Sequence, residues 1–384
     1  MHDKDARLQW ARRAVGAVFF VHGAVFASWA ARIPAIQEEL HLPSASLGVV
    51  LAGPGLGALA GSQIGGKLVD LLGSRKISAL APIILCLPLG LIPIATSTWP
   101  LMVLLVLLGA ADGSTAVAMN AQAVAVQEQC RRPVLNGMHA ARSIGAVAGG
   151  GGGAVTAAFG LPLTAQFAAT AVILAGISAV AAVGLLPEAH ITGTRGAPAS
   201  RGRMRVAVAL LALITFLAAL IEDAPASWSG VYLRQLGSTQ AVAASGYAIF
   251  SAGEVIGRLY SDRLVTRFGW GRLIRAGTLS CAAGLIVALL VGQVEVTLAA
   301  LVIVGIGISA VFPGAFAGAG AVPGADPGVT MGQVNFAGNL GWLAVSPIIG
   351  GIATAFSLPI ALGLLPIAAM IIAILAFSTE PQGR

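Results

Sequence analysis

The stretch Gly66-Lys-Leu-Val-Asp70-Leu-Leu-Gly73-Ser-Arg75-Lys76 joins two long apolar runs and combines glycines with one acid and three bases. A looser copy, Gly257-Arg-Leu-Tyr-Ser-Asp262-Arg263-Leu-Val-Thr-Arg267-Phe-Gly269, follows an apolar run in the second half of the chain. The tripeptide Ala-Ser-Trp also occurs twice, ending at Trp29 and at Trp228. These repeats predict one membrane unit present in two copies, which is an arrangement typical of transporters.

The composition is that of a protein that lives in a membrane. Hydrophobic residues make up 57% of the chain and charged residues only 10%, whereas ordinary soluble domains are about 25% charged. The apolar residues form continuous runs of about 20, which is long enough to cross about 30 Å of hydrocarbon as a helix. Because these runs do not alternate with polar residues, a transmembrane β-barrel is excluded.

Twelve apolar spans are predicted, six on each side of a polar, basic stretch at 187–204. The spans lie near 13–34, 46–70, 77–96, 100–127, 136–159, 164–186, 205–232, 241–262, 272–292, 296–320, 330–354 and 357–377. The first span is read as a retained helix, since its tripeptide recurs in an internal span. We therefore predict an all-α integral membrane protein with two pseudo-symmetric six-helix bundles, at 1–186 and 205–384, joined by the linker 187–204.

The charge pattern sets an orientation. The net charge is +7, but the basic residues sit in short connectors between spans, which favours insertion signals over nucleic-acid binding. Alternate connectors hold almost all of them, and the opposite set holds only Arg32 and Arg234. Since Lys and Arg concentrate in cytoplasmic loops, both termini and the linker are expected in the cytoplasm, with the chain in the cytoplasmic (inner) membrane.

Several classes of function are disfavoured by what the sequence lacks. The three cysteines and five histidines are dispersed, so neither a metal site nor a cofactor is expected. There is no Gly-x-x-x-x-Gly-Lys-Ser/Thr loop for a nucleotide, and hence no ATP drive. An integral-membrane enzyme would need a dense cluster of catalytic groups, so the chain is not expected to be an enzyme. A channel remains a weaker alternative to a carrier.

Twelve spans in two halves, with this glycine-rich acidic and basic loop after span 2, resemble the major facilitator superfamily. Gly66, Asp70, Gly73, Arg75 and Lys76 fit the motif of that family, while the second copy departs by one residue in its spacing. Within the superfamily, the stretches Trp29–Pro34 and Met119–Gln122 are similar to a bacterial group of inner-membrane carriers, distantly related to sugar permeases.

The resemblance implies a secondary active transporter that moves a small organic solute, sugar-like or another metabolite, by alternating access. Its expected partners are the solute, protons and the lipid bilayer, and the chain is expected to be a monomer. The alternatives are a proton-driven efflux antiporter for drugs or metabolites and an uncoupled facilitator. Efflux members usually carry an Arg within span 4 and a Gly-Pro signature in span 5, and both are missing here.

The resemblance also implies a conformational latch at the loop after span 2. Asp70 would bind the N-terminus of a helix of the other half and a nearby Arg, which holds the cytoplasmic side shut. The latch residues are Gly66, Asp70, Gly73, Arg75 and Lys76, with Asp262 and Arg263 in the second copy. The alternative is a plain insertion signal, which explains Arg75 and Lys76 but not Asp70.

Ionisable groups at membrane depth are functional candidates because each is costly there unless it faces water or a partner. At 1.5 Å of rise per helical residue, Asp112, Glu222 and Asp223 fall at similar depths, and Arg32 lies slightly farther out. Adjacent acids cannot both ionise cheaply in a low dielectric. We therefore expect Glu222, Asp223 and Asp112 to carry the proton, with Arg32 as their counter-charge. The alternative places Glu222 and Asp223 in the wet outer mouth.

The remaining polar and aromatic candidates are assigned to the substrate, in most cases beside a plainer interpretation. They are Arg32, Trp29, Trp228, Asn120, Gln122, Arg142, Asn335 and Asn339. The two tryptophans could instead anchor the membrane interface, and the two asparagines of span 11 could bridge helices. His22 is either a packed core residue or a site residue. An in-helix ion pair is expected between Glu254 and Arg258, four residues apart.

Glycines recur at every fourth position of span 5, at Gly145, Gly149 and Gly153. Such a smooth face allows close contact with another helix. The face serves either static packing or a surface that slides during transport, and the sequence favours neither.

Overall fold

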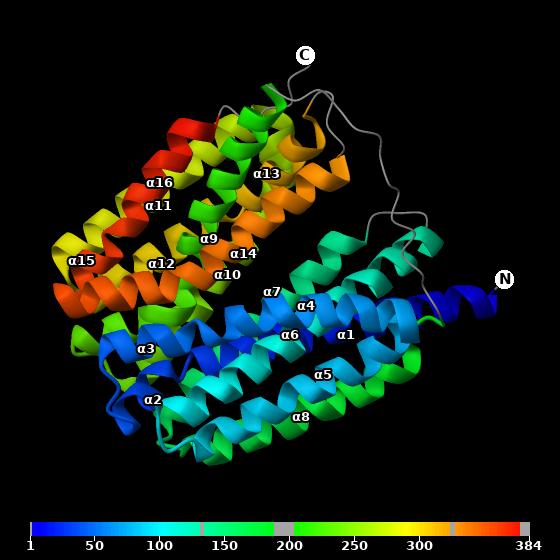
Figure 1. The fold of residues 1–384 in the computed structure, drawn as a ribbon, viewed down its shortest axis with the longest axis horizontal. Helices are drawn as coiled ribbons and strands as arrows, with labels where there is room; N and C mark the ends of the chain where they lie inside the picture. The colour runs from blue at the N-terminus through cyan, green and yellow to red at the C-terminus, as the bar shows by residue number, and fades with distance from the viewer. Residues whose placement is uncertain (1, 131–133, 188–202, 323–326, 377–384) are drawn as a thin grey trace. The chain divides into compact units, whose positions relative to one another are not determined.

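The computed structural model describes residues 2–130, 134–187, 203–322 and 327–376, which form helices joined by short turns (Figure 1). No strand occurs within these ranges, as expected for the predicted all-α class. The helices are α1 His2–Ala30, α2 Ile33–Glu39, α3 Ser44–Leu51, α4 Gly53–Leu72, α5 Ser74–Leu91, η1 Ile92–Ile94, α6 Thr98–Cys130, α7 Leu135–Ala158, α8 Leu163–Gly184, α9 Arg203–Gln235, α10 Gln240–Phe268, α11 Trp270–Val291, α12 Val294–Ile308, α13 Val311–Gly320, α14 Pro327–Ala355, α15 Leu358–Leu362 and α16 Leu364–Leu375.

Ten helical stretches of the described chain are long and apolar enough to cross a membrane. They are Arg7–Glu39, Ser44–Leu72, Ser74–Ile94, Thr98–Cys130, Leu163–Gly184, Arg205–Gln235, Trp270–Val291, Val294–Gly320, Thr330–Ala355 and Leu358–Leu375. Helices α7 and α10 are as long, with 24 and 29 residues, but less apolar because glycines and charged residues interrupt them. With these two helices, the described chain contains all twelve of the predicted stretches.

Prolines accompany breaks in three of these stretches. Ser44–Leu72 is divided at Ala52, so that Pro54 lies in the first turn of α4. Val294–Gly320 is divided between α12 and α13, with Pro313 in the first turn of α13. Proline cannot donate to the preceding turn, but it fits the first turn of a helix that restarts. The first stretch extends farther than the predicted 13–34: it breaks near Arg32 and continues as α2 to Glu39.

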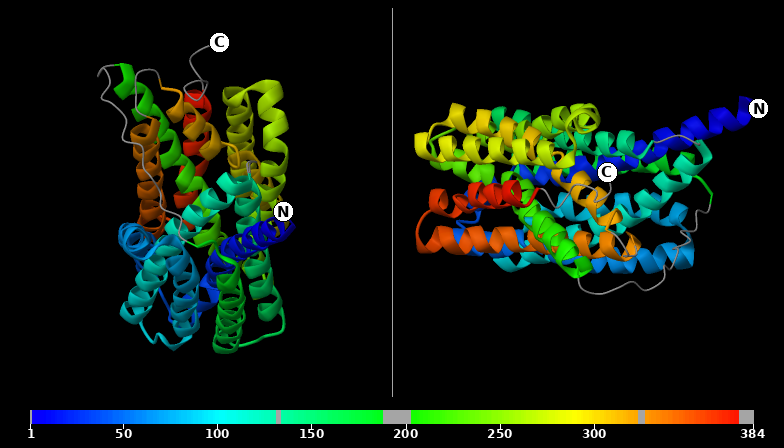
Figure 2. Two further views of the ribbon diagram at one scale, coloured as in Figure 1. Left: turned by 90° about the vertical axis from the view of Figure 1, so that its right-hand side faces the viewer. Right: turned by 90° about the horizontal axis from the view of Figure 1, so that it is seen from above.

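The chain forms two compact units. Unit 1 comprises Met1–Thr192 and Thr239–Ala248, and unit 2 comprises Gly193–Ser238 and Ile249–Arg384. Within each unit the long helices pack side by side, as in the pairs α4 and α6, α1 and α7, and α9 and α14 (Figure 2). The predicted bundle limits, 1–186 and 205–384, stay a prediction.

Glycines bring helices of unit 1 into backbone contact. A Cβ added at Gly145 of α7 would lie 2.0 Å from the carbonyl oxygen of Phe20 on α1, and one at Gly149 would lie 2.3 Å from that of Ala24. A Cβ at Gly153 would lie 2.7 Å from the side chain of Ala31. The predicted glycine face of α7 is therefore a close contact with α1, and no residue larger than glycine fits there without moving a helix.

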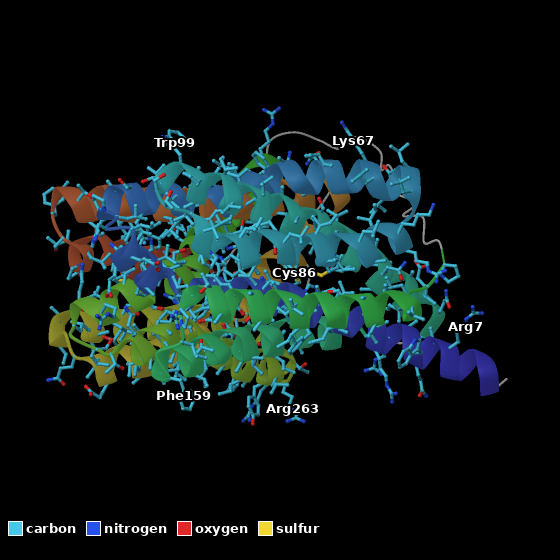
Figure 3. All side chains as sticks on the ribbon, turned by 90° about the horizontal axis from the view of Figure 1, so that it is seen from below. Arg7, Lys67, Cys86, Trp99, Phe159 and Arg263 are labelled. Atoms are coloured by element: carbon cyan, nitrogen blue, oxygen red, sulfur yellow. The ribbon has the colours of Figure 1, made fainter. Side chains whose placement is uncertain are left out.

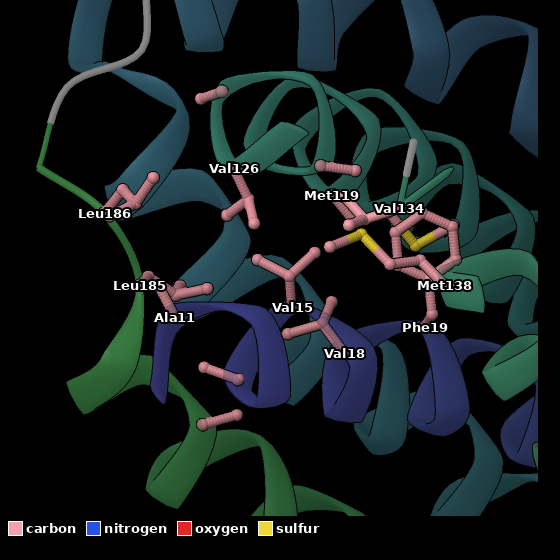
Figure 4. Close-up of a cluster of buried hydrophobic side chains, with 14 residues drawn as sticks. Ala11, Val15, Val18, Phe19, Met119, Val126, Val134, Met138, Leu185 and Leu186 are labelled. Carbon is pink, nitrogen blue, oxygen red and sulfur yellow. The ribbon is translucent and has the colours of Figure 1, made fainter. Parts of the chain in front are cut away.

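The interior and the outer surface of unit 1 are both apolar. Val15, Phe19, Met119 and Val126 belong to a buried cluster formed by α1, α6, α7 and the end of α8 (Figure 4). On the outside, side chains such as Trp99, which is 77% exposed, project away from the helices (Figure 3). An apolar surface of this kind is suited to lipid, because hydrocarbon tails have no need of polar partners.

The contact between α1 and α7 predicts a specific loss of stability. Replacing Gly145 with Ala should lower the free energy of unfolding by about 1–3 kcal/mol, because the added methyl group forces the two helices apart. Gly152 on the same helix has no neighbour within 4 Å of an added Cβ, so Gly152→Ala serves as the matched control and should leave stability unchanged or slightly raised. Thermal unfolding in detergent measures both, and a Gly145→Ala protein as stable as wild type would contradict the contact.

Candidate functional site

A buried histidine and a carboxylate meet between α1 and α6 in unit 1. His22 Nε2 lies 2.9 Å from Asp112 Oδ1, with the His22 side chain 7% exposed and that of Asp112 25% exposed. Asp112 was expected to take part in proton handling, and the structure gives it His22 as its partner. The two groups are close enough for an ion pair when the imidazole is protonated, and Nε2 has no hydrogen-bond partner among the described residues.

Helix α7 brings the backbone of Arg142 against α1 at the level of this pair. The backbone oxygen of Arg142 lies where a Cβ of Gly23 would be, which places Arg142 level with His22. Arg142 is half-buried, and in the ranges that the structure describes its guanidinium makes no hydrogen bond or ion pair. His139, one turn before it, contacts Phe19 edge-on with ring centroids 5.1 Å apart. Arg142 thus remains available to an anion or a hydroxyl group.

Arg32 is buried at the break between α1 and α2. Its side chain is 7% exposed in total, and Nη2 donates to the carbonyl oxygen of Leu161 at 3.2 Å. Its Nε and Nη1 have no hydrogen-bond partner among the described residues. Since Asp112 is paired with His22, the structure shows Arg32 bonded to a carbonyl and not to that acid. The predicted counter-charge role of Arg32 stays a prediction.

In unit 2, two carboxylates share one guanidinium. Arg258 Nη2 of α10 lies 2.7 Å from Glu254 Oε1 on the same helix and 3.4 Å from Glu222 Oε1 on α9. The predicted in-helix pair of Glu254 and Arg258 is therefore present, and Glu222 joins it. The Glu254 side chain is only 8% exposed. With both acids ionised this cluster carries one excess negative charge, which a single proton neutralises.

Asp223, next to Glu222, has a different partner. Its Oδ2 accepts a hydrogen bond of 2.9 Å from Ser227 Oγ, one turn later on α9. Both acids are partly buried, so the described structure does not place either on a fully open surface. Adjacent residues on a helix point about 100° apart, which is why one acid reaches Arg258 and the other does not.

The two repeated tryptophans are both interior residues. Trp29 is almost fully buried and contacts Phe26 edge-on, with ring centroids 6.5 Å apart, and Trp228 is fully buried. Neither indole N–H has a hydrogen-bond partner among the described residues. Their burial favours an internal role over an anchor at the membrane surface, which an exposed ring such as Trp99 fits better.

Gln122 uses its whole side-chain amide to hold helices together. Nε2 donates to Ser74 Oγ at 2.9 Å and to the carbonyl oxygen of Leu186 at 3.1 Å, while Oε1 accepts from the backbone N–H of Leu186 at 3.0 Å. Gln122 and Ser74 have no exposed surface. We therefore assign Gln122 a packing role, in which α6 clamps the start of α5 and the chain segment after α8.

The three asparagine candidates differ in their surroundings. Asn120 donates to the carbonyl oxygen of Ala116 on its own helix at 2.8 Å. Asn335 is exposed and Asn339 half-buried on α14, and neither amide has a partner in the part of the chain that the structure describes. The latter two are thus free to bind a solute.

The latch loop has the same backbone shape in both copies. Gly73 has φ 86° and Gly269 has φ 80°, and each precedes the first residue of a helix, α5 and α11 respectively. Only glycine adopts such a φ without strain, which explains both glycines of the motif. Gly73 is buried, whereas Asp70 is exposed and has no hydrogen-bond or ion-pair partner within the described ranges.

The other latch candidates lie on the surface or outside the described side chains. Arg75, Lys76 and Arg263 are exposed, and Gly66 has no neighbour within 4 Å of an added Cβ. Figure 3 shows the Arg263 side chain projecting from the surface. The side chain of Asp262 lies outside the described residues. The latch therefore stays a prediction.

Comparison with known proteins settles the family. The family model of the Major Facilitator Superfamily matches residues 14–346. The chain belongs to this superfamily. An uncharacterised transporter of Sinorhizobium fredii is 33% identical over 311 residues, covering 79% of this chain and 81% of its relative. The membrane protein MosC of Rhizobium meliloti is 29% identical over 350 residues, covering 90% of this chain and 84% of that protein.

Solved structures of superfamily members share the fold. The nucleoside transporter NupG superposes with a TM-score of 0.74 at 13% identity, covering 96% of this chain and 98% of NupG. A D-xylose–proton symporter superposes with a TM-score of 0.75 at 13% identity, covering 97% and 98%. This member of the superfamily is thus an all-α, multi-pass membrane transporter and not an enzyme. The likeness to the two structures concerns the fold alone.

Sequence reasoning missed two members of the ionisable clusters. His22 was left open between core and site, and Arg258 was assigned only to Glu254. Both contacts join different helices, His22 to Asp112 and Arg258 to Glu222. A signal was available in each case, because an ionisable residue at membrane depth requires a partner of opposite charge, but the sequence does not say which helix supplies it.

The hydrogen bonds of Gln122 predict that this residue stabilises the folded protein and does not bind the solute. Gln122→Leu should lower the free energy of unfolding by about 2–4 kcal/mol, since it leaves buried polar groups of Ser74 and Leu186 without partners. Asn120→Leu, two residues earlier, should change it by less than about 1 kcal/mol. Denaturant unfolding in detergent measures both, and equal stability of Gln122→Leu and wild type would rule the clamp out.

Proposed function

We propose that the chain is a secondary active transporter that moves a small organic solute, sugar-like or another metabolite, across the cytoplasmic membrane. It works by alternating access of its two halves and is driven by the proton gradient. The observation that carries the proposal is that each unit holds acidic and basic side chains in contact between its helices: Asp112 beside His22, and Glu222 with Glu254 beside Arg258.

The cluster in unit 2 is suited to binding and releasing one proton. In a low dielectric, the form with two ionised carboxylates and one guanidinium is disfavoured by its excess charge. A proton on one carboxyl neutralises the cluster, and contact with water allows that proton to leave. We assign the proton of this cluster to Glu222, and we propose Asp223, which lies beside it on α9 but outside the cluster, and Asp112 of unit 1 as further proton carriers.

The solute is proposed to contact residues that have free hydrogen-bonding groups or aromatic rings. Arg32, Arg142, Asn335 and Asn339 retain unpartnered donors among the described residues, and Trp29, Trp228 and Asn120 remain candidates beside them. Two superfamily members of similar fold are described as a nucleoside transporter and a D-xylose–proton symporter. These descriptions support a sugar-like solute and proton coupling in this chain.

The orientation and the latch complete the proposal. The basic connectors favour cytoplasmic termini, which would place Asp70, Arg75 and Lys76 at the cytoplasmic ends of α4 and α5. Asp70 is exposed and unpaired within the described ranges, so it is free to bind a group of the second half when the cytoplasmic side closes. The drug-efflux alternative is disfavoured because α6 carries Asp112 and no Arg at membrane depth.

Proton coupling makes a prediction for uptake into proteoliposomes. A proton gradient with the acidic side outside should raise uptake of the solute at least about fivefold over the rate without a gradient, since the proton and the solute move together. Glu222→Gln and Asp223→Asn imitate the protonated acids, so at least one variant should lose most of this stimulation while still exchanging solute across the membrane.

Two outcomes would contradict the proposal. Uptake by wild type that is equal with and without the gradient would make the protein an uncoupled facilitator. If both Glu222→Gln and Asp223→Asn kept the pH dependence of wild type, neither acid would carry the coupled proton. The matched control is Glu128→Gln on α6, because Glu128 belongs to none of the described ion pairs and should behave as wild type.

A further inference from the structure

One side of α14 combines amides, an aromatic ring and a hydroxyl group. Asn335, Asn339, Trp342 and Ser346 follow one another at intervals of four, three and four residues, which places them on one face of the helix. We call these four residues the α14 polar face. Asn335 and Asn339 were already candidates, whereas Trp342 and Ser346 are absent from the site described above.

The α14 polar face holds hydrogen-bonding groups that the protein leaves unused. The amides of Asn335 and Asn339 have no partner among the described residues, and the hydroxyl group of Ser346 is fully buried with no partner in the same ranges. The two amides are accessible, whereas Ser346, one turn beyond Trp342, has no exposed surface. Accessible amides without a protein partner indicate a place that another molecule completes.

An aromatic pair lies against this face. Phe312 of α13 stacks on Trp342 with ring centroids 5.5 Å apart and an angle of 23° between the planes, and Phe316 lies 6.2 Å from Phe312. Trp342 keeps 37% of its surface exposed. Part of its ring is consequently open to a ligand beside the free amides.

The side of α14 that lies about 100° around the helix from the polar face has a different chemistry. Phe336 and Leu340 are exposed there and purely apolar, as lipid requires. Bare amides in contact with lipid would each cost several kcal/mol, so the polar face must border water or a solute. Two exposed faces of opposite character assign the polar face to the solute pathway.

Charge is absent from both helices that build this place. Neither α13 nor α14 contains Asp, Glu, Lys or Arg. A phosphate, carboxylate or ammonium group would be left there without a counter-charge from these helices. Amide groups, in contrast, both donate and accept, as hydroxyl groups do, and aromatic faces stack on flat or ring-shaped apolar surfaces.

We propose that the α14 polar face, with Phe312, binds an uncharged ring that carries hydroxyl groups, as in a neutral sugar or a nucleoside. The accessible amides of Asn335 and Asn339 bind the hydroxyl groups of the ring, and Trp342 stacks on its apolar side. This inference rests on the proposed transport function and names the substrate class of that site.

Binding to the purified full chain in lipid nanodiscs tests the class. The probes form two matched pairs, glucose with glucose 6-phosphate and uridine with uridine 5′-monophosphate, measured by calorimetry. We expect one neutral member to bind at least about tenfold more tightly than its phosphate partner, and which pair responds separates a sugar from a nucleoside. Tighter binding of the phosphates, or binding by neither neutral probe, would overturn the inference.

Variants locate the binding to the face. Trp342→Ala and Asn339→Leu should each weaken binding of the responsive probe at least about tenfold, whereas Trp342→Phe should keep most of it because a ring remains. Trp99→Ala and Gln333→Leu are the matched controls, since both residues are exposed away from the polar face, and each should bind within about twofold of wild type.

Thermal unfolding shows whether each variant is folded. If Trp342→Ala does not fold, the test rests on Asn339→Leu, which should weaken binding, and on Trp342→Phe, which should keep most of it. Unchanged binding by a folded Trp342→Ala or Asn339→Leu protein would overturn the inference. The proposed transport function is tested separately by counterflow in proteoliposomes. Binding of a probe at this face without counterflow would contradict transport but not the binding site. Saturable transport of an anionic solute, and not of neutral rings, would contradict only the inferred substrate class.

Discussion

An ionised side chain at membrane depth costs several kcal/mol unless a partner or water offsets the loss of hydration. This constraint explains the pairing of the deepest charges in each unit. Asp112 is matched by His22, and Glu222 and Glu254 are matched by Arg258. In the proposed function these same clusters carry the transported proton, so one set of contacts would serve both stability and coupling.

The absence of water in the hydrocarbon region also limits where the backbone can break and how closely helices must pack. Helix breaks near Pro54 and Pro313 occur within the span-length stretches, where neighbouring helices must satisfy the freed groups. Glycines such as Gly145 and Gly149 let helices approach until backbone meets backbone. Gln122 adds a polar clamp with no exposed surface. The clusters of unit 1 are thus held on helices whose spacing is closely fixed.

Much of the fold follows from the sequence because it is repetitive. Runs of about 20 apolar residues, their breaks at prolines and the glycine positions of the loop after span 2 are all local patterns, and the helices follow them. The limits of the first span were less predictable, since Arg32 and Pro34 resemble an end signal. The chain instead resumes as α2, which extends that stretch to Glu39.

The candidate site was less predictable because its contacts join residues far apart in the sequence. Asp112 and Glu222 could be selected by depth alone, but their partners could not. Gln122 shows that a polar residue within a span can have a protein partner. Its position suggested substrate binding, and in the structure its amide bonds to Ser74 and Leu186. A polar residue in a span needs a partner, and the sequence does not say whether that partner is protein or solute.

Proton movement caused by the solute tests most directly whether the paired carboxylates couple transport to protons. Proteoliposomes that enclose a pH-sensitive dye, with no initial pH or voltage gradient, receive the transported solute from outside. If the carboxylates carry protons with the solute, the interior should acidify as the solute enters, and variants that neutralise the responsible acid should move solute without acidifying it. Solute entry by wild type with no change in internal pH would contradict proton coupling through these groups.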